Sequence, residues 1–485
     1  MLDFWFTLSP FLLGIYYLAI FIVVINILLE NRNPLKTHSY LLLLLLLPVL
    51  GLIIYLFFGQ HIRKRRIFSK SQLINSAFGQ KYIDEYLTLE NITPVHKALV
   101  SEQYDKLIRF LSRDLSPLSR NNKITLLKNG EEKFPALLEA LKEAENHIHI
   151  EYYIFTDDEI GEQISQVLMT KAQEGVQVRM IVDGVGSLAL RNTYFDKMKS
   201  AGVEIYEFMP VLFPSFTSKI NYRNHRKVVI IDGITSFTGG INVDDRYINN
   251  GKYPTYWRDT HIKLEGAAVK TLQFLFILNW QFVSKQPWIP TEKHFPKTEP
   301  SFGSSYVQVN ASGPDWDLAS IMDSFCLAIN SARDSLQIAT PYFIPNESIM
   351  NGITTSAKSG VSVEIMIPHA SDSWIVQAAS MSFMKHLLRA GVKVYLYKKG
   401  FLHSKTLTVD NSISVVGSAN MDHRSFDLNH EVNAYIYDPS VAQQLNENFE
   451  ADKADCILLN LKDWKNRSLR QKLLESVCRL LAPLL

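Results

Sequence analysis

The feature that most constrains this chain is a duplication, in which one series of β-strand and α-helix patterns occurs twice. Residues 175–182 (GVQVRMIV) are matched by residues 360–367 (GVSVEIMI), and residues 201–206 (AGVEIY) by residues 390–395 (AGVKVY). Alternating strands and helices favour a mixed or parallel sheet that is covered by helices on both faces. Two copies are too few for a solenoid, whose units are shorter. The sequence therefore predicts an α/β protein with two similar domains that face each other, joined by the Pro-rich residues 286–300.

A polar motif of the form H-x-K-x4-D occurs once in each copy, at residues 225–232 and at residues 403–410. The repeat keeps the same register beyond the motifs, pairing Gly239 with Gly417, Asn242 with Asn420, Asp244 with Asp422 and Arg246 with Arg424. Core packing preserves apolar positions and lets polar ones diverge, so these polar identities indicate function. A single histidine on a strand is usually structural, but two complete copies favour one shared active site. Because alternate residues of a strand point to one face, the histidine and lysine of each motif project together.

Two histidines and two lysines around one phosphate are suited to phosphodiester exchange. One neutral imidazole can attack phosphorus and form a phosphohistidine. The other can donate a proton to the departing alcohol and then accept one from the incoming alcohol. Lysine and asparagine side chains can hold the remaining phosphate oxygens. This chemistry needs no metal, nucleotide or redox cofactor, and the lysine within each motif disfavours a metal site.

The N-terminal residues 1–62 contain two uncharged stretches, Phe4 to Leu29 and Ser39 to Gln60. Each reaches the roughly 20 residues that cross a bilayer core, so we predict a two-helix transmembrane hairpin, followed by a connector at residues 63–120. The basic cluster at residues 61–66 is stronger than the Arg32 and Lys36 of the intervening loop. The positive-inside rule then places the catalytic part in the cytoplasm.

The overall composition excludes several classes of protein. The formal net charge is +2, so no general positive field indicates a nucleic-acid partner. The three cysteines are odd in number and far apart, which excludes a disulfide framework and paired-cysteine metal sites.

The paired motifs resemble those of the phospholipase D superfamily, from about Lys123 to the C-terminus. Further features resemble bacterial cardiolipin synthases. They are Asn33-Pro34 and the run LPVLG at 47–51, WRDTH at 257–261 followed by Glu265-Gly266, TPYFIP at 340–345, and Gly239-Gly240 where many superfamily members have Gly-Ser. The resemblance implies two phospholipase D-type domains with mixed sheets flanked by helices, at residues 121–290 and 301–485. The second domain is expected to end in an amphipathic helix, for which packing on lipid and packing on the protein body are equally open.

By this resemblance, the enzyme would reversibly transfer a phosphatidyl group between two phosphatidylglycerol molecules, giving cardiolipin and glycerol, at a bacterial inner membrane that it crosses more than once. His225 would be the nucleophile and His403 the general acid and base. An acidic residue downstream of each motif usually orients the histidine of that motif, here Asp259 and Glu431. The candidate catalytic residues are His225, Lys227, Asp232, His403, Lys405 and Asp410. The two motif aspartates among them are expected to stabilise the local fold rather than to touch substrate. The candidate phosphate-binding residues are Asn242, Asn420, Ser418 and Gly240.

Several alternatives remain compatible with the motifs. Water or another alcohol can attack the same phosphohistidine, so the chain could be a hydrolytic phospholipase D or a transferase that uses phosphatidylethanolamine or another alcohol. A nuclease of the same superfamily is disfavoured by the two apolar stretches and the near-neutral charge. A non-catalytic membrane scaffold is disfavoured by the two intact motifs. Acyl preference, oligomeric state and the order in which the histidines act are not encoded in any recognisable motif.

Overall fold

The computed structural model describes residues 2–29, 34–46, 51–52, 55, 102–190, 192–210, 221–296, 302–314 and 320–482. Residues 1–69 with 212–220 form one compact unit, and residues 70–211 with 221–485 form another. The second unit, called the body below, contains both copies of the repeat.

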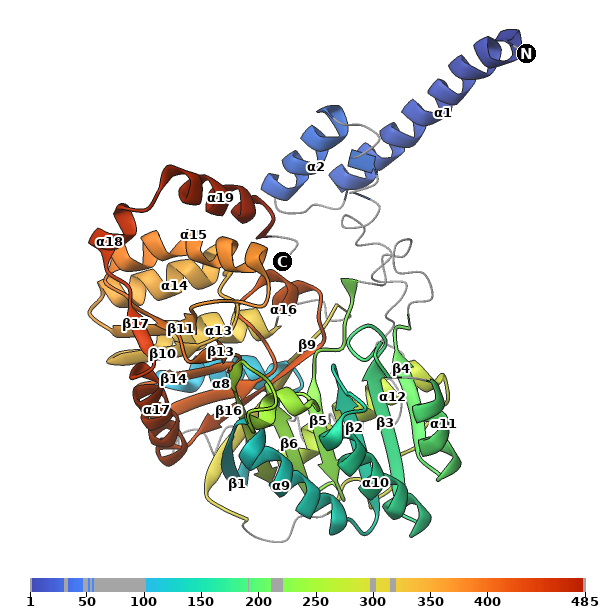
Figure 1. The fold of residues 1–485 in the computed structure, drawn as a ribbon, viewed down its shortest axis with the longest axis vertical. Helices are drawn as coiled ribbons and strands as arrows, with labels where there is room; N and C mark the ends of the chain where they lie inside the picture. The colour runs from blue at the N-terminus through green and yellow to red at the C-terminus, as the bar shows by residue number, and fades with distance from the viewer. Residues whose placement is uncertain are drawn as a thin grey trace. The chain divides into compact units, whose positions relative to one another are not determined.

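Among the described residues, the strands of both copies form one 15-stranded sheet in the order β17-β12-β11-β10-β14-β15-β16-β9-β1-β8-β6-β5-β2-β3-β4 (Figure 1). The first half contributes β1 (Ser119–Lys128), β2 (His147–Tyr152), β3 (Gln177–Asp183), β4 (Glu204–Phe208), β5 (Lys227–Ile231), β6 (Thr235–Gly239) and β8 (Thr260–Glu265). The second half contributes β9 (Ser305–Ser312), β10 (Ser335–Ala339), β11 (Ser362–Pro368), β12 (Lys393–Tyr397), β14 (Thr406–Val409), β15 (Ile413–Gly417), β16 (Glu431–Tyr437) and β17 (Cys456–Leu458). The halves join where β1 runs antiparallel to β9. Outward from that junction, corresponding strands follow in the same order on both sides.

Each half has a mixed sheet, as the duplication predicts. Strands β2, β3 and β4 are parallel to one another, as are β10, β11 and β12, whereas the hairpin strands β5–β6 and β14–β15 pair antiparallel. The helices that pack on these sheets are α9 (Asn129–Lys142), α10 (Glu159–Gln173), α11 (Asn192–Ser200), α12 (Val269–Ser284), α13 (Ser320–Ser331), α14 (Glu347–Lys358), α15 (Trp374–Ala390) and α17 (Pro439–Lys453).

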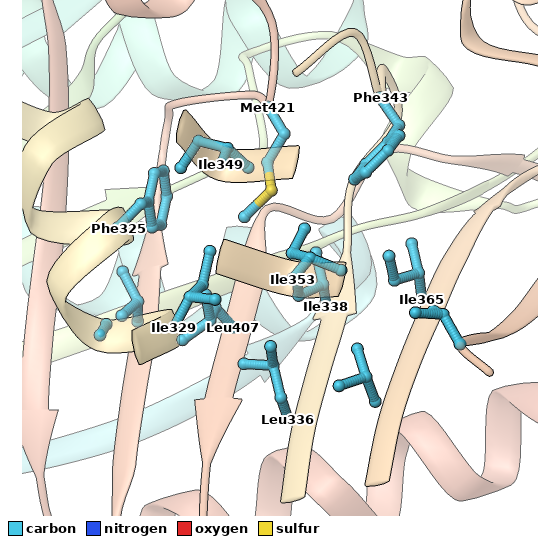
Figure 2. Close-up of a cluster of buried hydrophobic side chains, with 14 of the residues drawn as sticks. Phe325, Ile329, Leu336, Ile338, Phe343, Ile349, Ile353, Ile365, Leu407 and Met421 are labelled. Atoms are coloured by element: carbon cyan, nitrogen blue, oxygen red, sulfur yellow. The ribbon is translucent and has the colours of Figure 1, made fainter. Parts of the chain in front are cut away.

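The core of the second half shows why strand alternation requires helices on both faces. Leu336 and Ile338 of β10 and Ile365 of β11 pack with apolar side chains of α13 and α14, such as Phe325 (Figure 2). A separate cluster contains Ala339 and Met366, which directly follow Ile338 and Ile365 on the same strands. The aromatic ring of Phe449 from α17 belongs to this second cluster. Because successive strand residues point to opposite faces, both faces of this sheet must be covered by apolar groups.

Part of the predicted connector belongs to the second half. Residues 102–104 form a short 3₁₀ helix that leads into α8 (Asp105–Arg113), whose Leu107, Ile108 and Leu111 are buried in the core of the second half. The side-chain amide of Gln308 on β9 also donates to the carbonyl oxygens of Ile108 and Ser116. The remainder of the connector, including the basic cluster at residues 61–66, lies outside the described residues.

The N-terminal unit contains α1 (Leu2–Leu29) and α2 (Pro34–Leu46), which contact each other through the buried side chains of Ile27 and Leu44. Several apolar side chains of these helices are exposed, among them Phe21, Leu29 and Leu45. Within the described parts of the chain, no helix meets the combined length and apolarity of a membrane span. The transmembrane hairpin therefore remains a prediction.

The C-terminal segment forms α18 (Leu461–Lys465) and the amphipathic α19 (Leu469–Leu480), and α19 packs against α15. Glu475 and Cys478 of α19 are buried. The opposite face exposes 82% of Leu469, 63% of Leu473 and 79% of Leu480. The helix thus packs on the body through one face and leaves an apolar face uncovered by the described residues.

Candidate active site

The two motif histidines lie just before strands β5 and β14, where the halves meet. The backbone N–H of His225 donates to the carbonyl oxygen of His430 at 3.0 Å. The N–H of His403 donates to the carbonyl oxygen of Arg258 at 2.7 Å. Beside this second contact, β7 (Tyr256–Arg258) of the first half pairs in parallel with β13 (Gly400–Leu402) of the second. Each histidine backbone is therefore held by the opposite half of the protein.

The carboxylates that contact the histidines are also exchanged between the halves. Nδ1 of His225 lies 2.9 and 3.0 Å from the two carboxylate oxygens of Glu431. Nδ1 of His403 lies 2.7 Å from Oδ2 of Asp259. Both of these acidic residues contact a motif histidine, but each contacts the histidine of the other motif and not that of its own. Each half supplies the carboxylate for the histidine of the other, because the histidines approach the boundary from opposite sides.

The two imidazoles share one electrostatic environment. Burial lowers the pKa of His225 to about 4, against the opposing charge of Glu431, and the ammonium group of Lys405 from the other motif contributes to this lowering. Burial also lowers the pKa of His403 well below its ordinary value, and the two motif lysines and His225 add to the effect. Burial thus favours the neutral form of both rings. With Nδ1 facing a carboxylate, Nε2 is the atom that can attack phosphorus.

Each motif lysine folds back toward the backbone of its own histidine. Nζ of Lys227 donates to the carbonyl oxygen of His225 at 2.5 Å, and Nζ of Lys405 donates to that of His403 at 2.5 Å. Burial lowers the pKa of Lys227 to about 7 and that of Lys405 to about 8. A phosphate bound beside them would favour the charged form of both lysines, because an opposite charge raises the pKa of an amine.

The two carboxylates have unequal surroundings. Glu431 accepts hydrogen bonds from Oγ of Ser418 at 2.5 Å and from Nδ2 of Asn429 at 3.1 Å. Burial would raise the pKa of Glu431, but its interaction with His225, the charge of Lys227 and the Ser418 hydrogen bond hold the pKa below its usual value. Asp259 accepts from the backbone N–H of Thr260 at 2.7 Å, and burial raises its pKa to about 6. The duplicated site is therefore chemically asymmetric.

Gly240 explains the departure from the Gly-Ser pattern in the first copy. A Cβ atom at this position would lie 2.1 Å from Oδ1 of Asp259. In the second copy, Ser418 occupies the corresponding position, and its hydroxyl donates to Glu431. In the first copy, the Asp259 carboxylate that contacts His403 therefore occupies the space that a serine side chain would need.

Gly240→Ser should lower turnover at least 100-fold, because the new side chain displaces the Asp259 carboxylate from His403. Steady-state assays on purified enzyme would measure the loss. Ser418→Gly is the matched control, since it creates space and removes only the contacts of the hydroxyl with Glu431 and the Val432 backbone, so its loss should be smaller. Equal activity of Gly240→Ser and the wild type would contradict the steric account.

Aromatic rings line the site unequally. Three rings surround His403, with centroid separations of 5.4, 5.7 and 5.8 Å, and they belong to Trp257, Phe401 and Tyr247. Among the residues that the structure describes, His225 has one such neighbour, Tyr153, at 4.9 Å. Trp257 was named only as part of the WRDTH motif, and no role at the site was predicted for any of these aromatic residues. They lie outside the H-x-K-x4-D motifs, and no spacing rule marks them.

The motif aspartates lie at the far end of their strands from the histidines, and a catalytic role for them remains a prediction. Asp232 follows His225 by seven residues of largely extended chain, which corresponds to about 20 Å. Each carboxylate accepts three backbone hydrogen bonds of 2.7–2.8 Å, Asp232 from Glu145, Asn146 and His147, and Asp410 from Arg333, Asp334 and Ser335. They secure the chain at the start of β2 and β10, which agrees with the expectation that they stabilise the local fold.

Three of the four predicted phosphate-binding residues are engaged in contacts within the protein. Nδ2 of Asn242 donates to the Tyr247 hydroxyl at 2.9 Å, while Ser418 and Gly240 adjoin the two carboxylates. Oδ1 of Asn420 is buried without a hydrogen-bond partner among the described residues. A phosphate-binding role for these four residues remains a prediction.

Comparison with known proteins identifies the family. The family model for "Cardiolipin synthase, PLD-like domain" matches residues 137–253 and 325–453, which contain both motifs. The chain belongs to this family. The model for "Phospholipase D-nuclease N-terminal" matches residues 17–60. A cardiolipin synthase of Alkalihalophilus pseudofirmus is 41% identical over 97% of this chain and 93% of its own length. Cardiolipin synthase 2 of Bacillus anthracis is 40% identical over 99% of this chain and 91% of its own length.

A solved structure shares the fold of this cardiolipin synthase family member. Phosphatidylserine synthase of Haemophilus influenzae aligns with a TM-score of 0.61 and 17% identity, covering 78% of this chain and all of that one. At this identity the similarity concerns the fold alone.

Proposed function

We propose that this chain is a cardiolipin synthase that transfers a phosphatidyl group from one phosphatidylglycerol molecule to another and releases glycerol. One observation carries the proposal, namely two histidine–carboxylate pairs, each built across the boundary between the halves, with a buried lysine beside each histidine. The relatives named cardiolipin synthase, about 40% identical over nearly the whole chain, support the choice of lipid.

In the first step, Nε2 of one neutral histidine attacks the phosphorus of a phosphatidylglycerol. The N–P bond forms as the bond to the glycerol oxygen breaks, and the second histidine donates a proton to that oxygen. His225 is the nucleophile by family resemblance, which makes His403 the acid. The depressed pKa of His403 must rise for this role, and the negative charge of the arriving phosphate acts in that direction.

In the second step, the terminal hydroxyl of another phosphatidylglycerol attacks the phosphohistidine. His403, now neutral, accepts the hydroxyl proton while the N–P bond breaks, which regenerates both imidazoles. The two lysines stabilise the charge on the phosphoryl oxygens in both steps. The ester bond energy is retained in the intermediate, so the exchange is reversible and needs no nucleotide.

The proposal places the enzyme at the cytoplasmic face of a bacterial inner membrane, anchored by the N-terminal helices as a multi-pass protein. The match of residues 17–60 to an N-terminal family model and the exposed apolar side chains of α1 and α2 support this location. The exposed leucines of α19 lie among Arg470, Lys472 and Arg479, a composition suited to an anionic lipid surface.

Protease added outside intact cells should leave the body uncut, because the proposed orientation places the body in the cytoplasm. Digestion of the body under these conditions would overturn the proposed orientation.

Purified enzyme incubated with headgroup-labelled and acyl-labelled phosphatidylglycerol should yield cardiolipin and free glycerol in equal amounts, because every transfer releases one glycerol. Separating the lipids by chromatography and counting the label measures both products. Phosphatidic acid as the main lipid product would instead indicate a hydrolytic phospholipase D. Product formation only on addition of ethanolamine or another alcohol would indicate a different transferase.

A further inference from the structure

The proposed reaction involves two phosphates, of which only one reacts. The acceptor phosphatidylglycerol keeps its own phosphodiester intact while its terminal hydroxyl attacks. A three-carbon glycerol bridge with bonds of about 1.5 Å keeps this second phosphate within about 8 Å of the reacting phosphorus. The second phosphate is negatively charged and enters a largely buried site, so it requires a cation of its own.

The cations nearest the reacting centre are already committed. Lys227 and Lys405 lie beside the histidines and serve the phosphate that is transferred. Most of the surrounding arginines are paired with carboxylates: Arg223 with Asp183 at 3.2 Å, Arg246 with Asp244 at 2.6 Å and Arg258 with Asp452 at 2.7 Å. Arg226 is fully buried, and its guanidinium donates to the backbone carbonyl oxygens of Glu431 and Ser312.

Arg424 differs from these arginines. It lies on the short helix α16 (His423–Asp427) and is half-buried, and no carboxylate within the described chain forms an ion pair with it. The hydrogen bond that its guanidinium makes there is a long one of 3.4 Å to the carbonyl oxygen of Asn221. Its counterpart in the repeat, Arg246, is fixed by two hydrogen bonds to Asp244 and lies over the ring of Trp257.

Arg424 is also close to the His225 side of the site. Its backbone carbonyl oxygen accepts the N–H of Asn429 at 2.8 Å, and the side chain of Asn429 donates to the Glu431 carboxylate that contacts His225. Its charge acts on the phenol of Tyr153, whose ring lies against His225. The guanidinium acts electrostatically on Asp422 but forms no ion pair within the described chain, and it thus provides a cation beside the reacting centre.

We propose that Arg424 binds the unreacted phosphate of the acceptor phosphatidylglycerol, an inference that rests on the proposed function and names its acceptor subsite. The guanidinium holds this phosphate through charge-assisted hydrogen bonds. The terminal hydroxyl of the same lipid then attacks the phosphohistidine. The new O–P bond forms, the N–P bond breaks and the hydroxyl proton passes to the other histidine. The phosphate on Arg424 remains a diester throughout.

The test compares a charged acceptor with a neutral one. Phosphatidylglycerol in mixed micelles containing 1-butanol gives two products from one phosphohistidine, cardiolipin and phosphatidylbutanol. Because butanol has no phosphate, Arg424→Gln should lower the ratio of cardiolipin to phosphatidylbutanol at least tenfold while phosphatidylbutanol is still formed. An equal loss of both products would overturn the proposal.

Two further variants separate charge from structure. Arg424→Lys retains the cation and should recover most of the cardiolipin, so a loss as large as that of Arg424→Gln would overturn the proposal. Arg246→Gln alters the equivalent arginine of the first half and should leave the product ratio unchanged, whereas an equal fall in the ratio would refute the assignment to Arg424. Wild-type enzyme that makes phosphatidylbutanol but no cardiolipin would refute the proposed function itself.

Discussion

Replacing either His225 or His403 with alanine should lower the rate of cardiolipin formation by roughly 10⁴-fold or more. One histidine forms the covalent bond to phosphorus and the other transfers the proton in both steps, so neither can substitute for its partner. The rate would be measured with labelled phosphatidylglycerol. Thermal unfolding of each variant serves as the control, because the alanine also removes a contact to Glu431 or Asp259.

A substrate with a good leaving group separates the roles of the two histidines. A p-nitrophenyl phosphodiester expels nitrophenolate without protonation, so the loss of the general acid matters little in the first step. If His225 is the nucleophile, His403→Ala should still release a burst of nitrophenolate equal to the enzyme concentration, and His225→Ala should release none. The opposite result would exchange the two roles. Substantial steady-state turnover by either variant would contradict a shared site.

The duplication made much of the fold predictable. A repeat of strand and helix patterns predicts two similar halves, each with a mixed sheet and helices on both faces. The structure and the family comparison agree with this, and among the described residues the strands of both halves join in one continuous sheet. The repeated H-x-K motifs identified His225, Lys227, His403 and Lys405 because polar identities in a fixed register have no role in packing. The junction of β1 with β9 was not predictable, since pairing between edge strands leaves no pattern in the sequence.

The side-chain contacts between the halves could not be predicted from the sequence either. A motif gives the distance between residues along the chain, but it does not show which half supplies a neighbouring side chain. The exchange of Glu431 and Asp259 therefore escaped prediction although both residues were identified. Asp232 and Asp410 show the complementary case. They share a motif with the histidines, yet a strand of this length carries them to its far end.

The exchange of carboxylates leads to a second large effect. Glu431→Gln and Asp259→Asn should each lower turnover by about 10²- to 10⁴-fold, because a neutral amide neither stabilises the imidazolium nor fixes the tautomer that exposes Nε2. Amide side chains nearly preserve shape, so stability should change less than activity. Kinetics with phosphatidylglycerol measure the first quantity, and unfolding by denaturant measures the second.

The p-nitrophenyl substrate determines which histidine each carboxylate serves. A carboxylate variant should behave like the alanine variant of the histidine it contacts, whichever histidine is the nucleophile. Glu431→Gln should therefore resemble His225→Ala in burst amplitude or rate, and Asp259→Asn should resemble His403→Ala. Pairing within each half would give the opposite grouping. Each of these contacts crosses the boundary between the halves. If the variants group as these contacts predict, each catalytic histidine depends on a carboxylate that the other half supplies.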